Sequence, residues 1–271
     1  MPLFFMISGF LDKQETDISL KSYRKILYSL AIPYLIYNIP YLPIAFSHPA
    51  SYALQLLTAS VPPNDPTWFF FALLWVKIIT ITFRKYEIEL FCVSIVTYIV
   101  LQYSGVNLGT YFCCHAILTG IIFFYLGKLY HLIFECQYMY VTILLGSLLI
   151  SYSITNFGRY DMYWGFVGNP LLYLLTAGAS SIALLTLCKY MEHRIGTKIL
   201  NRVIKPISRG TMIIVGTHYI IAHFANKMLF TTHGGFGIKL LYVMVLLLGY
   251  WVIIKRTYNV FPVLYGKTHQ R

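Results

Sequence analysis

Apolar segments of helical length follow one another along almost the whole chain, separated by short polar joints. This feature constrains the fold most, because a helix that is apolar all round has to be buried in a core or in a bilayer. The segments approach the roughly 20 residues that cross about 30 Å of hydrocarbon. The predicted helices are Ile26–Phe46, Trp68–Phe83, Ile88–Tyr103, Tyr111–Tyr130, Met139–Thr155, Pro170–Tyr190, Thr211–Phe230 and Ile238–Ile254.

The composition excludes an ordinary water-soluble globule. Hydrophobic residues make up 58% of the chain and charged residues only 11%, whereas soluble domains carry roughly 25% charged residues. We therefore predict an all-α fold, a polytopic transmembrane helix bundle of about eight full helices and a shorter N-terminal one. We expect a single domain over residues 1–271, with Pro33 and Pro40 kinking the first full helix.

Basic residues are distributed unevenly between alternate joints. Of the 21 Lys and Arg residues, 17 fall in one alternating set of joints and three in the opposite set. Because basic loops stay in the cytoplasm, the sequence predicts a protein of the inner (cytoplasmic) cell membrane with a cytoplasmic C-terminus. The net charge of +12 then reflects topology, and no nucleic-acid partner is expected. The basic joints are 12–25, 84–87, 128–138, 189–210 and 255–271; the opposite set is 47–67, 104–112, 156–169 and 226–239.

The first residues form an incomplete segment. Met1–Leu11 is apolar, but at 1.5 Å per residue it covers only about half of the hydrocarbon thickness. It has no basic region or small-residue cleavage site of the kind that signal peptides carry. We expect it to be the second half of a helix, in a domain that is N-terminally truncated.

Short motifs along the chain occur in the order of a known family. The series consists of PLFFMISGF, a basic loop with LAIPYLIYN, TWFFFALLWVK, YFCCHAILTGIIFFYLGKLY, ISRGTMIIVGTHYII and FPVLYGK. It resembles the membrane acyltransferase-3 family of sugar O-acetyltransferases over nearly the whole chain. The Arg and His that are regarded as essential on that family's first helix have no counterpart in this sequence.

The resemblance implies an enzyme that transfers an acetyl or other acyl group to a hydroxyl of a carbohydrate or cell-surface glycan. Acetyl-CoA, or another acyl-CoA, would be the donor substrate, with no bound cofactor and no metal. The implied partners are the lipid bilayer and a glycan or lipid-linked sugar acceptor.

His218 is the candidate catalytic residue, because it aligns with the family's late histidine. A histidine within an apolar segment usually faces a bundle interior or an aqueous cavity, although an interhelical hydrogen bond is an equally good explanation. Arg24 and Lys25 lie in the family's basic stretch and are candidates for binding the CoA phosphates. The alternative is that they only mark the cytoplasmic side.

Two further residues are substrate-binding candidates. Lys77 is the one formal charge deep within a predicted segment, which indicates a polar cavity; its alternative is snorkelling toward the far interface. Trp68 is the first residue of the same segment, and its alternative role is that of an aromatic residue at the membrane interface. His115 follows two cysteines, but with no second histidine or carboxylate in register no metal site is predicted.

Two other functions remain open. A transporter or flippase for glycan intermediates would use the proline-kinked helix and the interior His and Lys as a substrate path. An inactive, truncated remnant of the acyltransferase is the other alternative.

Overall fold

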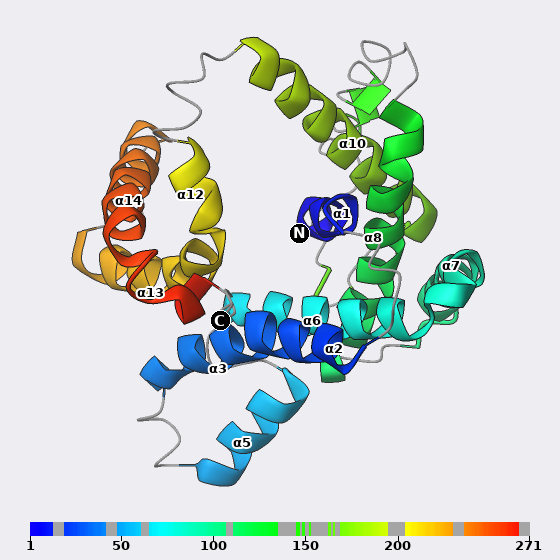
Figure 1. Cartoon of the computed structure of the whole chain (residues 1–271), viewed down its shortest axis with the longest axis horizontal. Coiled ribbons are helices and arrows are strands. Elements are labelled where there is room, and N and C mark those ends of the chain that lie inside the picture. Colours follow the sequence, from blue (N-terminus) through cyan, green and yellow to red (C-terminus); the bar gives the residue numbers. More distant parts are fainter. Residues whose placement is uncertain are drawn as a thin grey trace. The chain divides into compact units, whose positions relative to one another are not determined.

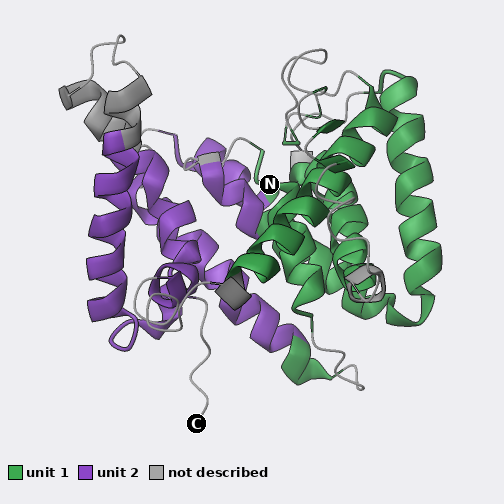
Figure 2. Cartoon of the chain, turned by 90° about the horizontal axis from the view of Figure 1, so that it is seen from above, with its two compact units in different colours: residues 1–22, 58–60, 71–194 green, residues 23–57, 61–70, 195–271 purple. Residues whose placement is uncertain are grey.

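The computed structural model describes residues 1–12, 19–41, 48–60, 65–106, 111–134, 169–194, 204–229 and 236–265, with scattered positions from 145 to 165. Every secondary-structure element in these ranges is helical, which confirms the all-α prediction. The chain divides into two compact units, coloured separately in Figure 2. Unit 1 comprises residues 1–22, 58–60 and 71–194; unit 2 comprises residues 23–57, 61–70 and 195–271.

Unit 1 is organised around helix α8 (Cys114–Phe134), which α1 (Pro2–Phe10), α7 (Glu87–Tyr103) and α10 (Pro170–Arg194) all contact. The labels in Figure 1 locate these helices. Helix α6 (Trp68–Thr82) supplies residues 71–82 to this unit. The middle of α8 forms the core, with fully or almost fully buried side chains at Ile121, Ile122, Phe123, Phe124 and Tyr125.

Helices α1 and α8 approach so closely that glycine is required on each. A Cβ added at Gly9 would overlap the Phe124 carbonyl oxygen, and one added at Gly127 would overlap the Met6 carbonyl oxygen. A Cβ at Gly120 would lie 2.8 Å from the Phe5 ring and 2.9 Å from Val76. Small residues allow two helix backbones to come into direct contact, so the packing of α1 depends on these positions.

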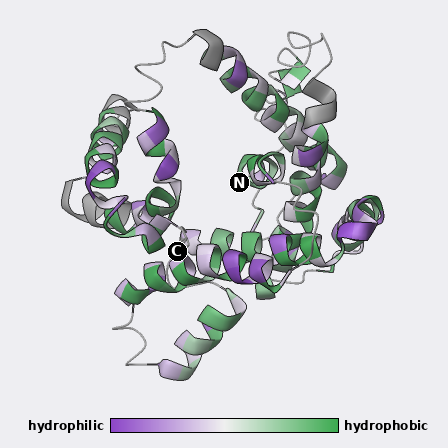
Figure 3. Ribbon diagram, in the orientation of Figure 1, coloured by the Kyte–Doolittle hydropathy of each residue, from purple (hydrophilic) through white to green (hydrophobic). Residues whose placement is uncertain are grey.

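Helices α7 and α10 bury polar side chains and expose apolar ones. On α7, Ser94 and Tyr98 are buried, whereas Val93, Val96 and Val100 are 58–60% exposed. On α10 the buried residues include Thr176, Ser181 and Thr186. The exposed large apolar residues are Leu171, Leu175, Leu184, Leu187 and Met191, and Lys189 near the end of the helix is exposed as well. This is the reverse of the pattern in a water-soluble helix. Figure 3 colours the helices by hydropathy and shows green, hydrophobic stretches along them.

Two helices among the described residues are long and apolar enough to cross a membrane, Arg84–Tyr103 and Pro170–Met191. The predicted bundle of about eight full spans is therefore not confirmed. Among the described residues, Trp68–Thr82, Cys114–Tyr130 and Thr211–Ile221 are shorter apolar helices. The predicted helix Met139–Thr155 lies mostly outside the described residues.

Unit 2 begins with a helix of changing geometry where one continuous segment was predicted. Helix α2 (Leu20–Ile26), which starts in unit 1, leads into a π-helical turn, η1 (Leu27–Ala31), then α3 (Ile32–Asn38) and the 3-10 turn η2 (Ile39–Tyr41). Pro33 cannot donate to the Ser29 carbonyl, and this missing bond is accommodated by the wider turn. Helix geometry also changes at Pro40, within η2.

The remaining elements of unit 2 pack around α3 and α13 (Thr211–Leu229). Helix α13 contacts α3, the 3-10 turns η3 (Asp65–Thr67) and η7 (Pro262–Tyr265), and α12 (Lys205–Arg209), which also packs on α14 (Phe236–Thr257). Helix α5 (Pro49–Thr58) lies in a stretch that the sequence predicted as a joint. Its 10 residues are too few to register as an apolar segment.

Candidate functional site

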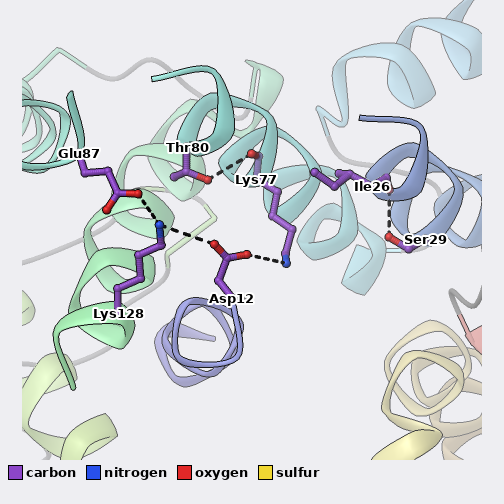
Figure 4. Close-up of polar contacts among 7 residues, drawn as sticks. All are labelled: Asp12, Ile26, Ser29, Lys77, Thr80, Glu87 and Lys128. Atoms are coloured by element: carbon purple, nitrogen blue, oxygen red, sulfur yellow. Dashed lines mark hydrogen bonds and ion pairs between the residues drawn. The ribbon is translucent and has the colours of Figure 1, made fainter. Parts of the chain in front are cut away.

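Four charged side chains from distant parts of the sequence meet in unit 1, and we call them the charged cluster: Asp12, Lys77, Glu87 and Lys128. Lys128 Nζ lies 2.6 Å from Glu87 Oε1 and 3.6 Å from Asp12 Oδ2. Lys77 Nζ lies 3.8 Å from Asp12 Oδ1. Figure 4 shows the Asp12 carboxylate between the two ammonium groups.

The charges of this cluster balance one another in a partly buried position. The Lys128 side chain is 13% exposed and that of Glu87 is 29% exposed. The ammonium of Lys128 also lies 5.6 Å from the Phe124 ring centroid, and that of Lys77 lies 6.0 Å from it. Removing one partner of a partly buried ion pair leaves the other charge uncompensated, and this destabilises the fold. The cluster therefore ties the end of α1 to α6, α7 and α8.

The charged cluster gathers residues from joints that the basic-residue count assigned to one side of the membrane. Asp12, Glu87 and Lys128 come from the joints 12–25, 84–87 and 128–138. Lys77 reaches the same group from within its helix, in the direction that snorkelling toward the far interface requires. The role of Lys77 in substrate binding stays a prediction, and Asp12, Glu87 and Lys128 were not predicted as site residues.

His218, the predicted catalytic residue, lies on α13 and is half-buried. Its Nδ1 atom lies 2.9 Å from the Ile214 carbonyl oxygen and 3.0 Å from the Val215 carbonyl oxygen. Because a carbonyl can only accept, Nδ1 must carry the proton and donate. In the neutral ring, Nε2 is then the unprotonated nitrogen, which is the state that a general base needs.

The other predicted site residues of unit 2 have different surroundings. Arg24 and Lys25 are exposed in the last turn of α2. Trp68 is 7% exposed at the start of α6 and meets the Phe69 ring edge-on at 6.3 Å. Four of the five predicted residues thus belong to unit 2, and Lys77 belongs to unit 1.

Unit 2 also has a buried polar centre at Asn38, which is 0% exposed. Asn38 Nδ2 donates to the Tyr34 carbonyl at 2.8 Å and to Thr67 Oγ1 at 3.1 Å. The Tyr52 hydroxyl donates to the Asn38 carbonyl at 2.8 Å. Burial raises the pKa of Tyr52 above its usual range, which preserves this donor. These contacts connect α3, α5 and η3 into one structure.

Sequence reasoning considered His115 only as a metal ligand. Within the part of the chain that the structure describes, no group of three or more His, Cys, Asp or Glu could hold a metal ion. His115 instead pairs with Gln102, at 3.4 Å between Nδ1 and Nε2. Gln102, a polar residue in the last turn of α7, was the available signal, but the sequence does not show that it pairs with His115.

Comparison with protein-family models, with curated proteins and with solved structures gives no match for this chain.

Proposed function

We propose that the chain is an integral membrane O-acyltransferase that moves an acetyl or other acyl group from acyl-CoA to a hydroxyl of a carbohydrate or cell-surface glycan. It would act in the inner cell membrane with its C-terminus in the cytoplasm. The ordered series of motifs suggests this reaction, and the inside-out pattern of α7 and α10 supports a membrane location.

The observation that carries the proposal is the orientation of His218. Acyl transfer requires a base to accept the proton of the attacking hydroxyl. With Nδ1 held by two carbonyls of its own helix, the neutral ring presents Nε2 as that base. The exposed Arg24 and Lys25 supply cations that suit the phosphates of CoA.

The direct test measures transfer from acetyl-CoA radiolabelled in its acetyl group. Membranes containing the full chain are incubated with the donor and a polysaccharide extract, and ester-linked label on the glycan is counted after hydroxylamine release. We expect label well above that of membranes lacking the chain. His218→Ala should reduce the rate by about 10²–10⁴-fold, the contribution of a general base.

His48→Ala is the matched control, because His48 is exposed just before α5. It should leave the rate unchanged. Absence of transfer by the folded wild-type chain would contradict the proposal. In that case, translocation of a fluorescent lipid-linked glycan across vesicles would favour the flippase alternative, and absence of translocation would favour the inactive remnant.

A further inference from the structure

Four cationic side chains gather in unit 2 where α12 packs on α14, and we call them the basic surface: Lys205, Arg209, Lys255 and Arg256. All four are exposed. Figure 1 shows α12 beside α14. The whole of α13 separates the two helices in the sequence, so only the fold of unit 2 brings these cations together.

A close contact between the two helices holds the cations in this arrangement. Gly210, the residue after α12, packs on Ile254, and a Cβ added at Gly210 would overlap the Ile254 side chain. Ile254 is 1% exposed, and Lys255 and Arg256 follow it in the last turn of α14. Arg209, directly before Gly210, therefore lies against the turn that carries the other two cations.

Aromatic rings hold two members of the basic surface in place. The Arg209 guanidinium carbon lies 5.4 Å from the Tyr258 ring centroid, and the Lys255 ammonium lies 5.3 Å from the Trp251 ring centroid. Tyr258 in turn meets the ring of the buried Tyr265 edge-on at 5.0 Å. A cation above a ring is held without a carboxylate, so its charge is not neutralised.

No carboxylate balances this surface. The sequence contains no Asp or Glu after Glu192, and no residue that the structure describes forms an ion pair with the basic surface. In the charged cluster of unit 1, by contrast, two carboxylates balance two ammonium groups. Like charges one helical turn apart, as at Lys205 and Arg209, repel each other. An anion bound here would relieve that repulsion.

Exposed apolar side chains continue from the basic surface. Val260, Phe261 and Val263, in the segment that follows α14, are 65%, 54% and 36% exposed. The segment turns back on the helix, because the Phe261 N–H donates to the Thr257 carbonyl at 2.9 Å. Cations next to exposed aromatic and aliphatic side chains are typical of protein that meets lipid headgroups. A soluble anion would make no use of this apolar edge.

We propose that the basic surface binds the phosphate headgroup of an anionic phospholipid, with Val260 and Phe261 against the lipid. The guanidinium of Arg209 suits this ligand, because its fork of N–H donors matches two phosphate oxygens. The cations belong to the joints 189–210 and 255–271, both predicted on the cytoplasmic side, where anionic lipids attract basic segments. The assignment goes beyond the acyltransferase and shares with it only the membrane location.

The test measures lipid binding to the full chain purified in dodecyl maltoside. The probe is dioleoyl phosphatidylglycerol, and the control is dioleoyl phosphatidylcholine, which has the same acyl chains and a phosphate but no net charge. Native mass spectrometry counts the lipids bound at each concentration. We expect phosphatidylglycerol to bind at least about fivefold more tightly, the contribution of one cation near a membrane surface. Equal affinities, or no binding, would overturn the proposal.

A double variant locates the lipid on the protein. Arg209→Gln with Lys255→Gln removes two cations from exposed positions, and we expect about 20–30-fold weaker binding of phosphatidylglycerol, about fivefold for each cation. Should this variant not fold, Lys205→Gln with Arg256→Gln removes the other two cations, with the same expectation.

The matched control is Lys21→Gln with Lys85→Gln, which removes the same charge from exposed positions of unit 1. It should bind phosphatidylglycerol as the wild type does. Equal weakening in the control and in the variant of the basic surface would mean that net charge alone attracts the lipid, and this would overturn the assignment.

Soluble competitors distinguish a lipid headgroup from other sources of phosphate. Glycerol 3-phosphate and CoA both carry phosphate but no acyl chain of a lipid. We expect neither compound, at millimolar concentration, to displace phosphatidylglycerol from the wild-type chain. Displacement by either one would show that the basic surface takes a soluble phosphate, and it would overturn the lipid assignment.

The same preparations are assayed for acetyl transfer, so that the two proposals can fail separately. Preferential binding of phosphatidylglycerol without transfer would refute the acyltransferase and retain the basic surface as a lipid site. Transfer without a preference for phosphatidylglycerol would retain the acyltransferase and refute the lipid site.

Discussion

Gly9 of α1 and Gly127 of α8 occupy reciprocal positions, each where a Cβ would overlap the backbone of the other helix. Two motifs that the sequence presents more than 100 residues apart, PLFFMISGF and IIFFYLGKLY, therefore meet backbone to backbone. The contact fixes α1, the short segment whose length alone gave no reason to expect a packed helix.

Gly9→Ala and Gly127→Ala should each destabilise unit 1 by about 1–3 kcal/mol, the usual cost of overpacking a close contact. Thermal unfolding in detergent, followed by circular dichroism, measures this loss. Gly249→Ala is the control, because a Cβ at Gly249 meets nothing within 4 Å and alanine favours a helix. Equal stability of all three variants would show that α1 is not held by this contact.

Helix positions could be predicted well from the sequence, because a long apolar run indicates a helix whether that helix is buried in a protein core or in a membrane. The predicted Trp68–Phe83, Ile88–Tyr103 and Thr211–Phe230 agree closely with α6, α7 and α13. Helix α5 was missed, since a helix of mixed polarity in a joint lacks that signal. The number of membrane spans was not established by the same pattern.

The candidate sites could be predicted only in part. Lys77 was recognised as unusual because a charge within an apolar run is costly. Its partner Asp12 is 65 positions earlier in the chain, and only the tertiary fold brings their side chains to 3.8 Å. The role of Gln102 as the partner of His115 depends likewise on how α7 packs against α8.

Lys128→Met should destabilise the chain by about 1–3 kcal/mol, because it leaves the Glu87 and Asp12 carboxylates without their shared cation in a partly buried site. Unfolding by denaturant measures the change, and Lys85→Met, at an exposed position, should shift stability by less than about 0.5 kcal/mol. The double variant with Glu87→Gln should recover part of the loss. Additive losses would mean that the pair makes no net contribution.

Val96→Arg tests whether the exposed face of α7 contacts lipid. Val96 is 60% exposed in the middle of the helix, and an arginine at the centre of a membrane span costs about 2.5–3.5 kcal/mol in insertion. We expect less protein to remain in the membrane pellet after alkaline carbonate extraction. Val106→Arg, exposed beyond the end of α7, should insert normally, and equal recovery of both variants would contradict a lipid-facing α7.

Tyr52→Phe tests the polar centre of unit 2. Removing the hydroxyl leaves the Asn38 carbonyl without its donor at 2.8 Å, so we expect a loss of about 1 kcal/mol in the free energy of unfolding at neutral pH.

Because the folded pKa of Tyr52 is raised, the stabilisation by Tyr52 in the wild type is present below the unfolded-state pKa near 10 and is lost as the pH rises through the folded pKa. The difference between wild type and Tyr52→Phe should therefore shrink as the pH rises past that value, as measured by denaturant unfolding at each pH. Tyr28→Phe, at a 55% exposed position, should match wild type throughout. A constant difference across the pH series would mean that Tyr52 contributes only through packing.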